Sequence, residues 1–158
     1  MIGRVLFFGC LFFVACGRDE AALDEHTGQI ILERQEPRPA RLGRLPASGA
    51  WCARDTTLSI VGSNESWSAA IALRLHWPVD SGAVVAVDSA HLGGKAGIAV
   101  RQLSDSIRTA IVAHTGTVTI EKGGRELAGR FELGSGADST AVSLNGRFEG
   151  INVVSSCP

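Results

Sequence analysis

The sequence predicts an all-β fold over residues 49–158, an antiparallel β-sandwich or small barrel. Apolar and polar residues alternate at period two in several segments, and Gly, Asn, Asp and Ser separate these segments. No long amphipathic helical pattern occurs in the same region. Strands of five to eight residues at this spacing are typical of sandwiches and barrels. The length of 158 residues suits one domain preceded by a tail.

The first clear strand is expected at residues 67–75, where Trp67, Ile71 and Leu73 share a face. Residues 84–87 form a short apolar run, and residues 98–101 alternate again. Residues 106–112 fit either a strand or a turn of helix. Residues 117–121 then place Val118 and Ile120 on one side. These segments predict a sheet with one buried face.

The pair Gly123-Gly124 predicts a two-residue hairpin, because glycine adopts the positive φ that such turns need. Beyond it, Leu127-Ala128-Gly129-Arg130-Phe131-Glu132 is repeated with one change as Leu144-Asn145-Gly146-Arg147-Phe148-Glu149. Leu, Gly and Phe share a parity, so the glycine leaves room for a neighbouring aromatic ring or marks a bulge. In the second copy Asn145-Gly146 also fits a type I′ turn, but analogy with the first copy favours a straight strand.

The N-terminus has the features of an export signal ending at Cys16. Arg4 precedes an apolar stretch over residues 5–15, and the charged run Arg18-Asp19-Glu20 follows. Eleven apolar residues are too few to cross a membrane, and Phe13 is too large for an ordinary signal-peptidase site. The run Phe13-Val14-Ala15-Cys16 resembles the lipobox of bacterial lipoproteins, although that family prefers Leu where Phe13 stands.

The resemblance implies that residues 1–15 are removed and that Cys16 carries a diacylglyceryl group and a further acyl chain such as palmitate. Two or more acyl chains hold a protein firmly on a membrane. The predicted location of the protein is then the cell envelope. Because Gly17 is not the Asp that retains enteric lipoproteins in the inner membrane, the outer membrane is favoured where the cell has one.

Residues 16–48 are predicted to be the lipidated cysteine and a flexible tether. Acidic residues precede a stretch with Arg34, Arg38, Arg41 and Arg44 and scattered prolines, a composition that buries little apolar surface. Within it, residues 29–32 fit a short strand or a docking peptide. The basic stretch is interpreted as a solvated linker, with a partner or headgroup contact as the alternative.

Cys52 and Cys157 are expected to form a disulfide, because an exported domain lies in an oxidising compartment. A redox or metal-binding pair is the alternative, disfavoured because there is no Cys-x-x-Cys. The C-terminal part, from Gly116-Thr117-Val118-Thr119-Ile120 through the two Gly-Arg-Phe copies, also resembles small β-sheet domains of uncharacterised bacterial lipoproteins. That resemblance implies a small β-sheet fold and a location in the cell envelope, but it implies no active site.

The sequence shows no catalytic or metal motif, and no cofactor is predicted. The four histidines are dispersed and form no metal-binding motif, and the Gly-x-Ser-x-Gly sequence of serine hydrolases is missing. The net charge of −1 gives no electrostatic reason to expect nucleic-acid binding. Trp77, before Pro78, is a possible exposed contact for a saccharide or an envelope protein. The sequence therefore favours a non-enzymatic binding or envelope-scaffold module. A carrier of an apolar ligand in a barrel cavity is the alternative, and a hydrolase built from Asp80, Asp88, Ser104-Asp105-Ser106 and histidines is a weaker one.

Overall fold

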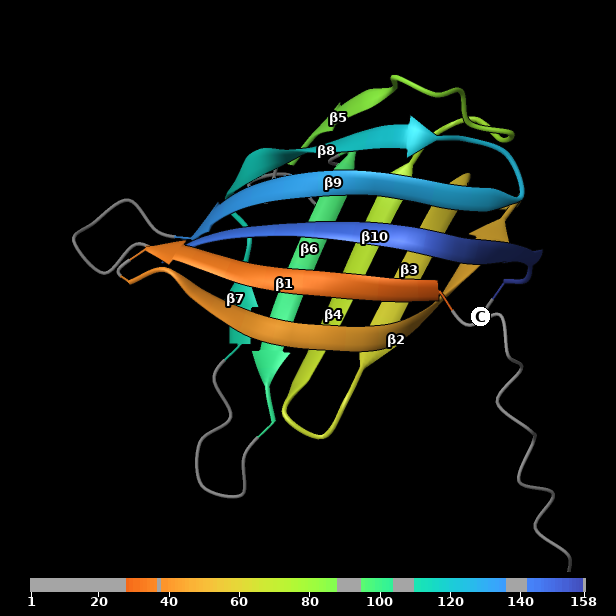
Figure 1. The fold of residues 1–158 in the computed structure, drawn as a ribbon. Coiled ribbons are helices and arrows are strands. Elements are labelled where there is room, and N and C mark those ends of the chain that lie inside the picture. The colour runs from red at the N-terminus through yellow and green to blue at the C-terminus, as the bar shows by residue number, and fades with distance from the viewer. Residues whose placement is uncertain (1–27, 37, 88–94, 104–109, 136–141, 158) are drawn as a thin grey trace, which may run out of the picture.

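The computed structural model describes residues 28–36, 38–87, 95–103, 110–135 and 142–157, and these form a single curled sheet (Figure 1). The all-β prediction is confirmed, in the form of a ten-stranded half-barrel. The spatial order is β5-β8-β9-β10-β1-β2-β3-β4-β6-β7. The strands are β1 (Gly28–Glu36), β2 (Ala40–Cys52), β3 (Thr57–Ser63), β4 (Trp67–Arg74), β5 (Val84–Ala86), β6 (Ala96–Gln102), β7 (Ala110–Val112), β8 (Thr115–Lys122), β9 (Glu126–Ser135) and β10 (Val142–Ser155).

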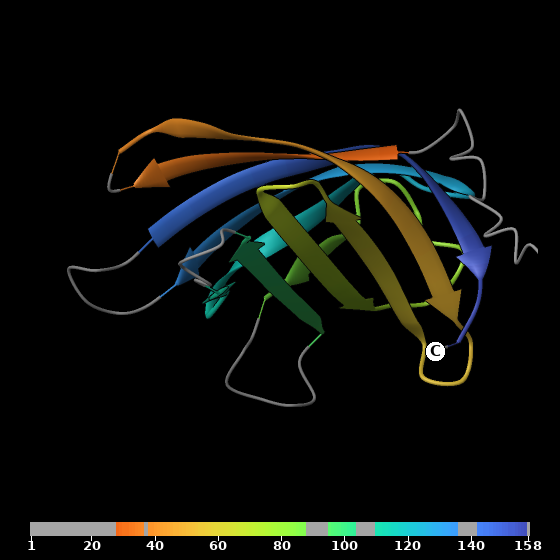
Figure 2. The same ribbon diagram turned by 90° about the horizontal axis from the view of Figure 1, so that it is seen from below.

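The sheet folds over itself into two layers whose strands cross steeply (Figures 1 and 2). One layer holds β5, β8, β9, β10 and β1, and the other holds β3, β4, β6 and β7. The long strand β2 belongs to both, since residues 40–47 pair with β1 and residues 47–52 pair with β3. Such crossing of layers is a known way for sheets to pack around one core.

The core lies between the layers and consists of the inward residues of the alternating strands. Leu58 and Ile60 of β3, and Ile71 and Leu73 of β4, are each 0–1% exposed. The same cluster continues into Val118 and the other layer. Each such aliphatic side chain contributes about 1.5–3 kcal/mol when fully buried. No polar or charged side chain is buried among the described residues.

The repeated Leu-x-Gly-Arg-Phe-Glu segments lie side by side on β9 and β10. Gly146 stands opposite Phe131, and Gly129 stands opposite Phe148. A Cβ on Gly146 would lie 2.1 Å from Cζ of Phe131, and one on Gly129 would lie 2.5 Å from Cζ of Phe148. Each glycine therefore makes room for the ring of the other copy. The straight strand through Asn145-Gly146 is confirmed, because both residues lie inside β10.

The predicted hairpin between β8 and β9 is present, but with a different turn. Three residues, Gly123 to Arg125, separate the strands, and of the two glycines only Gly124 has positive φ, at 95°. A type I′ turn needs positive φ at both positions. Gly123 is required for a different reason, since a Cβ there would lie 2.1 Å from the carbonyl oxygen of Val79.

The predicted domain boundary at residue 48 is wrong, because residues 28–48 form β1 and most of β2 in the middle of the sheet. Residues 29–32, for which the sequence predicted a short strand or a docking peptide, lie within β1. There Ile30 and Leu32 are fully buried in the core. Pro46 fits in β2 because pairing with β3 begins only at Ala47. Residues 17–27 and Pro37 lie outside the described residues.

Beyond the start of β1, the strands on its two sides pair directly with each other. Val153 to Ser155 of β10 run parallel to Gly49 to Trp51 of β2. A Cβ on Gly28 would lie 2.6 Å from the carbonyl oxygen of Gly150, so the strand begins in a tight fork between its neighbours. Gly28, the first described residue, therefore lies beside Gly150 of β10, close to the point where β10 and β2 begin to pair with each other.

Candidate functional site

A disulfide closes the end of the domain at which β1 begins. Cys52, at the end of β2, is bonded to Cys157 across a sequence separation of 105, as predicted. The parallel pairing of β10 with β2 brings the two cysteines together, with their Cα atoms 4.6 Å apart. Cys52 is buried and Cys157 is exposed. The bond therefore attaches the C-terminus to the sheet.

Trp77 is not a freely exposed aromatic residue. It lies in the connection between β4 and β5, partly buried against the core. Its ring stacks on Trp51, with the centroids 5.9 Å apart and the planes at 23°. Trp51 is itself buried beside Cys52. A saccharide would have at most one face of Trp77 to stack on, so Trp77 serves chiefly to extend the core toward the disulfide.

The residues considered for hydrolysis are not assembled into a site in the described structure. His76 and Asp80 are both exposed in the β4–β5 connection. Asp88, His91 and Ser104-Asp105-Ser106 lie outside the described residues, as do His26 and Cys16. Over the ranges that the structure describes, no three His, Cys, Asp or Glu residues lie close enough to hold a metal ion.

The outer side of β8, β9, β10, β1 and the first half of β2, here called the charged face, carries both signs of charge. Arg130, Arg147 and Arg44 lie in one cross-strand row with Ile31 between the last two. Ile31 is only 2% exposed, although it points away from the core. The aliphatic stems of neighbouring arginines can cover such a residue. A shallow depression of about 140 Å³ lies beside it, lined by Ile31, Glu33, Asn145, Gly146 and Arg147.

Acidic residues flank this row, so the charged face has no single sign. Glu33 and Glu132 belong to the next cross-strand row, and the Arg130 guanidinium is ion-paired with Glu121. The Gln29 side chain donates to the Glu149 carboxylate. Of the basic residues in this part of the sequence, Arg41 and Arg44 lie on this mixed surface. Arg34 lies near the end of β1, and its Nε donates to the Arg38 carbonyl at 2.9 Å.

The outer side of β3, β4, β6, β7 and the last residues of β2 and β10, here called the smooth face, is very different. Its side chains are small and uncharged over two adjacent rows. The first row is Ser48, Val61, Ala70, Ala99 and Val112. The second row is Val154, Ala50, Ser59, Ala72 and Gly97.

This face holds three of the four large apolar side chains that are exposed among the described residues. Val61 is 51% exposed, Val112 is 49% exposed and Val154 is 59% exposed. The fourth, Val84, lies on the edge strand β5. The three valines are separated by Ala, Ser and Gly on one uncharged surface, and apolar side chains exposed together on one surface mark an interaction site more often than scattered single residues do. This surface is separate from Trp77, the possible contact residue predicted from the sequence.

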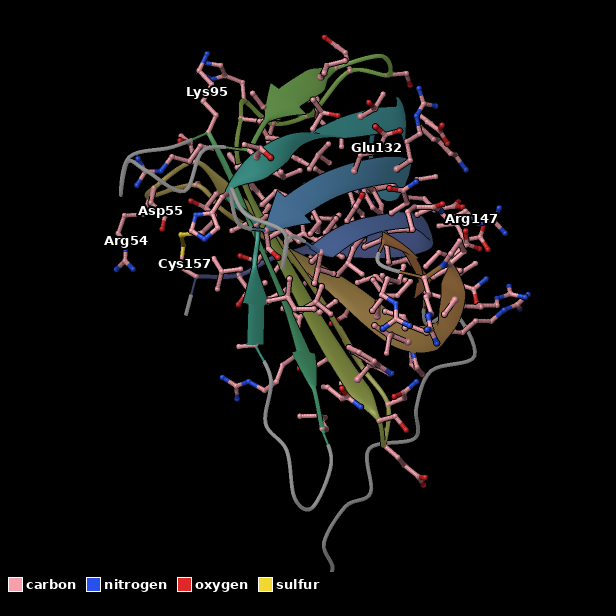
Figure 3. The ribbon with its side chains drawn as sticks, turned by 90° about the vertical axis from the view of Figure 1, so that its left-hand side faces the viewer. Arg54, Asp55, Lys95, Glu132, Arg147 and Cys157 are labelled. Carbon is pink, nitrogen blue, oxygen red and sulfur yellow. A yellow bond between two sulfur atoms is a disulfide. The ribbon has the colours of Figure 1, made fainter. Side chains whose placement is uncertain are left out.

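Charged residues are confined to the ends of the strands that carry the smooth face. Arg74, Lys95, Arg54 and Asp55 lie at one end, and Glu65 and Arg101 lie at the other. Figure 3 shows Arg54, Asp55 and Lys95 on the opposite side of the molecule from Arg147. Neither Glu65 nor Arg74 forms an ion pair with another described residue.

Comparison with protein-family models, curated proteins and solved structures finds no match to this chain. Within the described ranges, no helix has the length and hydrophobicity needed to cross a membrane. The site must therefore be interpreted from its own geometry, and the smooth face is the candidate that the geometry favours.

Proposed function

We propose that the chain is a lipoprotein held in the cell envelope through Cys16, and that its β-domain is a non-enzymatic binding or scaffold module. The single observation that carries the binding role is the smooth face, an exposed sheet surface with two uncharged rows and three exposed valines. The solvent-exposed face of an antiparallel sheet ordinarily carries polar side chains, while apolar side chains point to the core. A face of Ala, Ser, Gly and Val instead permits close contact with a flat partner.

The structure gives the carrier and hydrolase alternatives no comparable support. One cluster of buried side chains occupies the space between the two layers, which a filled core requires. The His and Asp residues that are described around Trp77 are solvent-exposed. We therefore place the function on the outer surface of the domain.

The anchor in this proposal is short. Only eleven residues separate Cys16 from Gly28, instead of the longer tether that the sequence predicted. Fully extended, such a segment spans at most about 40 Å. The domain would stay within that distance of the bilayer, close enough to meet partners attached to the same membrane.

Fractionation of cells that produce the full chain tests the anchor. Cys16→Ala should move the protein from the membrane fraction to the soluble fraction, because the acylated thiol is lost. Cys10→Ala is the matched control, since the proposal removes Cys10 with the signal segment, and it should leave the membrane association intact. Retention of Cys16→Ala in membranes, or an intact mass without acyl groups, would overturn the anchor.

A further inference from the structure

We infer that the depression on the charged face binds a free α-amino acid as a zwitterion, with Arg147 holding its carboxylate and Glu33 its ammonium group. The inference goes beyond the proposed function, because it concerns a different surface from the smooth face. Three observations carry it: two opposite charges that line one depression without contacting each other, an apolar floor between them, and a volume that suits a small ligand.

The depression lies over two neighbouring strands, β10 and β1. Arg147 is directly opposite Ile31, and Asn145 is directly opposite Glu33. Because residues two apart on a strand point to the same face, these four side chains stand at the corners of one rectangle of the sheet. Arg147 and Glu33 occupy diagonal corners, and such diagonal neighbours lie about 7–8 Å apart. Their side chains therefore border the same depression from two sides.

The two charges on this diagonal have no partner within the described part of the chain. Neither Arg147 nor Glu33 forms an ion pair or a side-chain hydrogen bond with another described residue. Arg130, the neighbour of Arg147 in its row, is paired with Glu121. Arg41 stands opposite Glu33 on β2 but is not among the residues that line the depression. Both charges are thus available to a ligand.

Each corner of the rectangle offers a different chemical group. A guanidinium such as that of Arg147 binds a carboxylate through two parallel N–H donors. The Glu33 carboxylate only accepts hydrogen bonds, so it suits the N–H donors of an ammonium group. The Asn145 amide both donates and accepts, so it can bond to either end of the ligand. Ile31 is 2% exposed and provides an apolar floor for C–H groups.

A ligand that carries both charges fits this arrangement better than a ligand that carries one. A simple anion at Arg147 would bring its charge close to the Glu33 carboxylate, and a simple cation at Glu33 would approach the Arg147 guanidinium. Each approach of like charges costs energy. A zwitterion meets an opposite charge at both ends, so these two residues together select it over either ion.

The volume limits the ligand to a small molecule. Pockets for drug-sized ligands measure about 300–1,000 Å³, whereas this depression measures about 140 Å³. A free amino acid is therefore a better match in size than a peptide or a disaccharide. Because the depression is shallow and both charged side chains are exposed to solvent, we expect weak binding, with a dissociation constant on the order of 1 mM.

Titration of the full-length chain in detergent with L-alanine, followed by amide chemical shifts in NMR spectra, tests the inference. The amide signals of Ile31 and Gly146 should move and saturate, while the signal of Ala99 on the smooth face should stay in place. Acetate and methylammonium each carry only one of the two charges. Each of them alone should bind at least about tenfold more weakly than alanine.

Two charge-removing variants test the assigned roles. Arg147→Gln and Glu33→Gln should each raise the dissociation constant for alanine about tenfold or more, because one charge of the ligand loses its partner. Both side chains are exposed, so neither change should unfold the domain. Arg130→Gln and Glu132→Gln are the matched controls on the adjacent strand β9, outside the lining of the depression, and they should bind alanine like the parent chain.

Three results would overturn the inference. The first is an absence of shifts at Ile31 and Gly146 when alanine is raised to ten times the expected dissociation constant. The second is acetate that binds as tightly as alanine, which would show a simple anion site at Arg147. The third is equal loss of binding in the variants and their controls, which would show that the overall charge of the face attracts the ligand. None of these results alters the outcome of Cys16→Ala fractionation, which tests the anchor separately.

Discussion

The ring of Phe131 lies over Gly146, and in the reciprocal arrangement the ring of Phe148 lies over Gly129. The two copies of Leu-x-Gly-Arg-Phe-Glu therefore pack their aromatic rings by using each other's glycines. Both rings are about 1% exposed, and they are among the largest fully buried side chains of the domain. The repeat is thus explained by packing on β9 and β10.

Substitution of either glycine should destabilise the domain. Gly146→Ala forces the Phe131 ring to move, and overpacking of this kind costs about 1–3 kcal/mol in the free energy of unfolding. Urea unfolding followed by fluorescence would measure the change. Gly97→Ala is the control, because the added methyl meets open space, and it should change stability by less than about 0.5 kcal/mol. Equal effects at Gly146 and Gly97 would contradict the reciprocal packing.

Removal of the disulfide should lower stability without changing the fold. The bond closes a loop of about 100 residues, for which the chain-entropy model gives up to about 4.7 kcal/mol. The Cys52→Ala/Cys157→Ala double variant should therefore unfold at a lower temperature than the parent chain, as measured by circular dichroism. Addition of a reductant should shift the parent in the same direction and leave the double variant unchanged. An unchanged melting temperature in the double variant would show that the bond does not constrain the unfolded chain.

A truncation in β1 should distinguish a central strand from a tether. Leu32 is fully buried, so Leu32→Ala should cost about 2–5 kcal/mol in the free energy of unfolding. In a solvated tether the same change would have no measurable effect. Val84→Ala, on an edge strand where the side chain is 64% exposed, is the matched control and should be nearly neutral. Thermal unfolding of the two variants side by side makes the comparison.

The ion pair on the charged face should contribute little. The Arg130 and Glu121 side chains are 58% and 49% exposed, and exposed pairs contribute about 0.2–1 kcal/mol. Arg130→Gln should therefore lower stability by less than about 1 kcal/mol in low salt. The difference should shrink further in 1 M salt, because screening weakens the pair in the parent chain. A large and salt-independent loss would indicate that Arg130 has another role.

The sequence predicted those strands in which apolar and polar residues alternate at period two and turn-forming residues mark the ends. The alternation of Trp67, Ile71 and Leu73 identified β4, and the shared parity of Leu, Gly and Phe identified β9 and β10. Only residues 29–32 of β1 were recognised as fitting a short strand, and the first half of β2 was assigned to the tether, because residues 17–48 are rich in charged side chains and contain three prolines. Only the buried side chains of Ile30 and Leu32, which depend on partners more than 100 residues away in β10, make this segment central.

The smooth face was missed for a different reason. Period-two alternation identifies the residues that point inward, but it does not show which outward residues of different strands become neighbours. Ala70 and Ala72 are unremarkable within 67–75, and they become part of a surface only when Val61 and Ala99 align with Ala70. Small residues occupy the outward positions 70, 72, 97 and 99 of two neighbouring strands. Once the register is known, this pattern identifies the smooth face.

The fork at Gly28 has a mechanical consequence. β1 is held on both sides, by β10 and β2, and the chain that leads to Cys16 leaves from its first residue. A force that pulls Gly28 along the direction of β1 loads both hydrogen-bond ladders in shear at the same time, and it does not unzip them one bond after another. In a domain anchored through Cys16 as proposed, a pull directed along β1 is resisted by both of its ladders together.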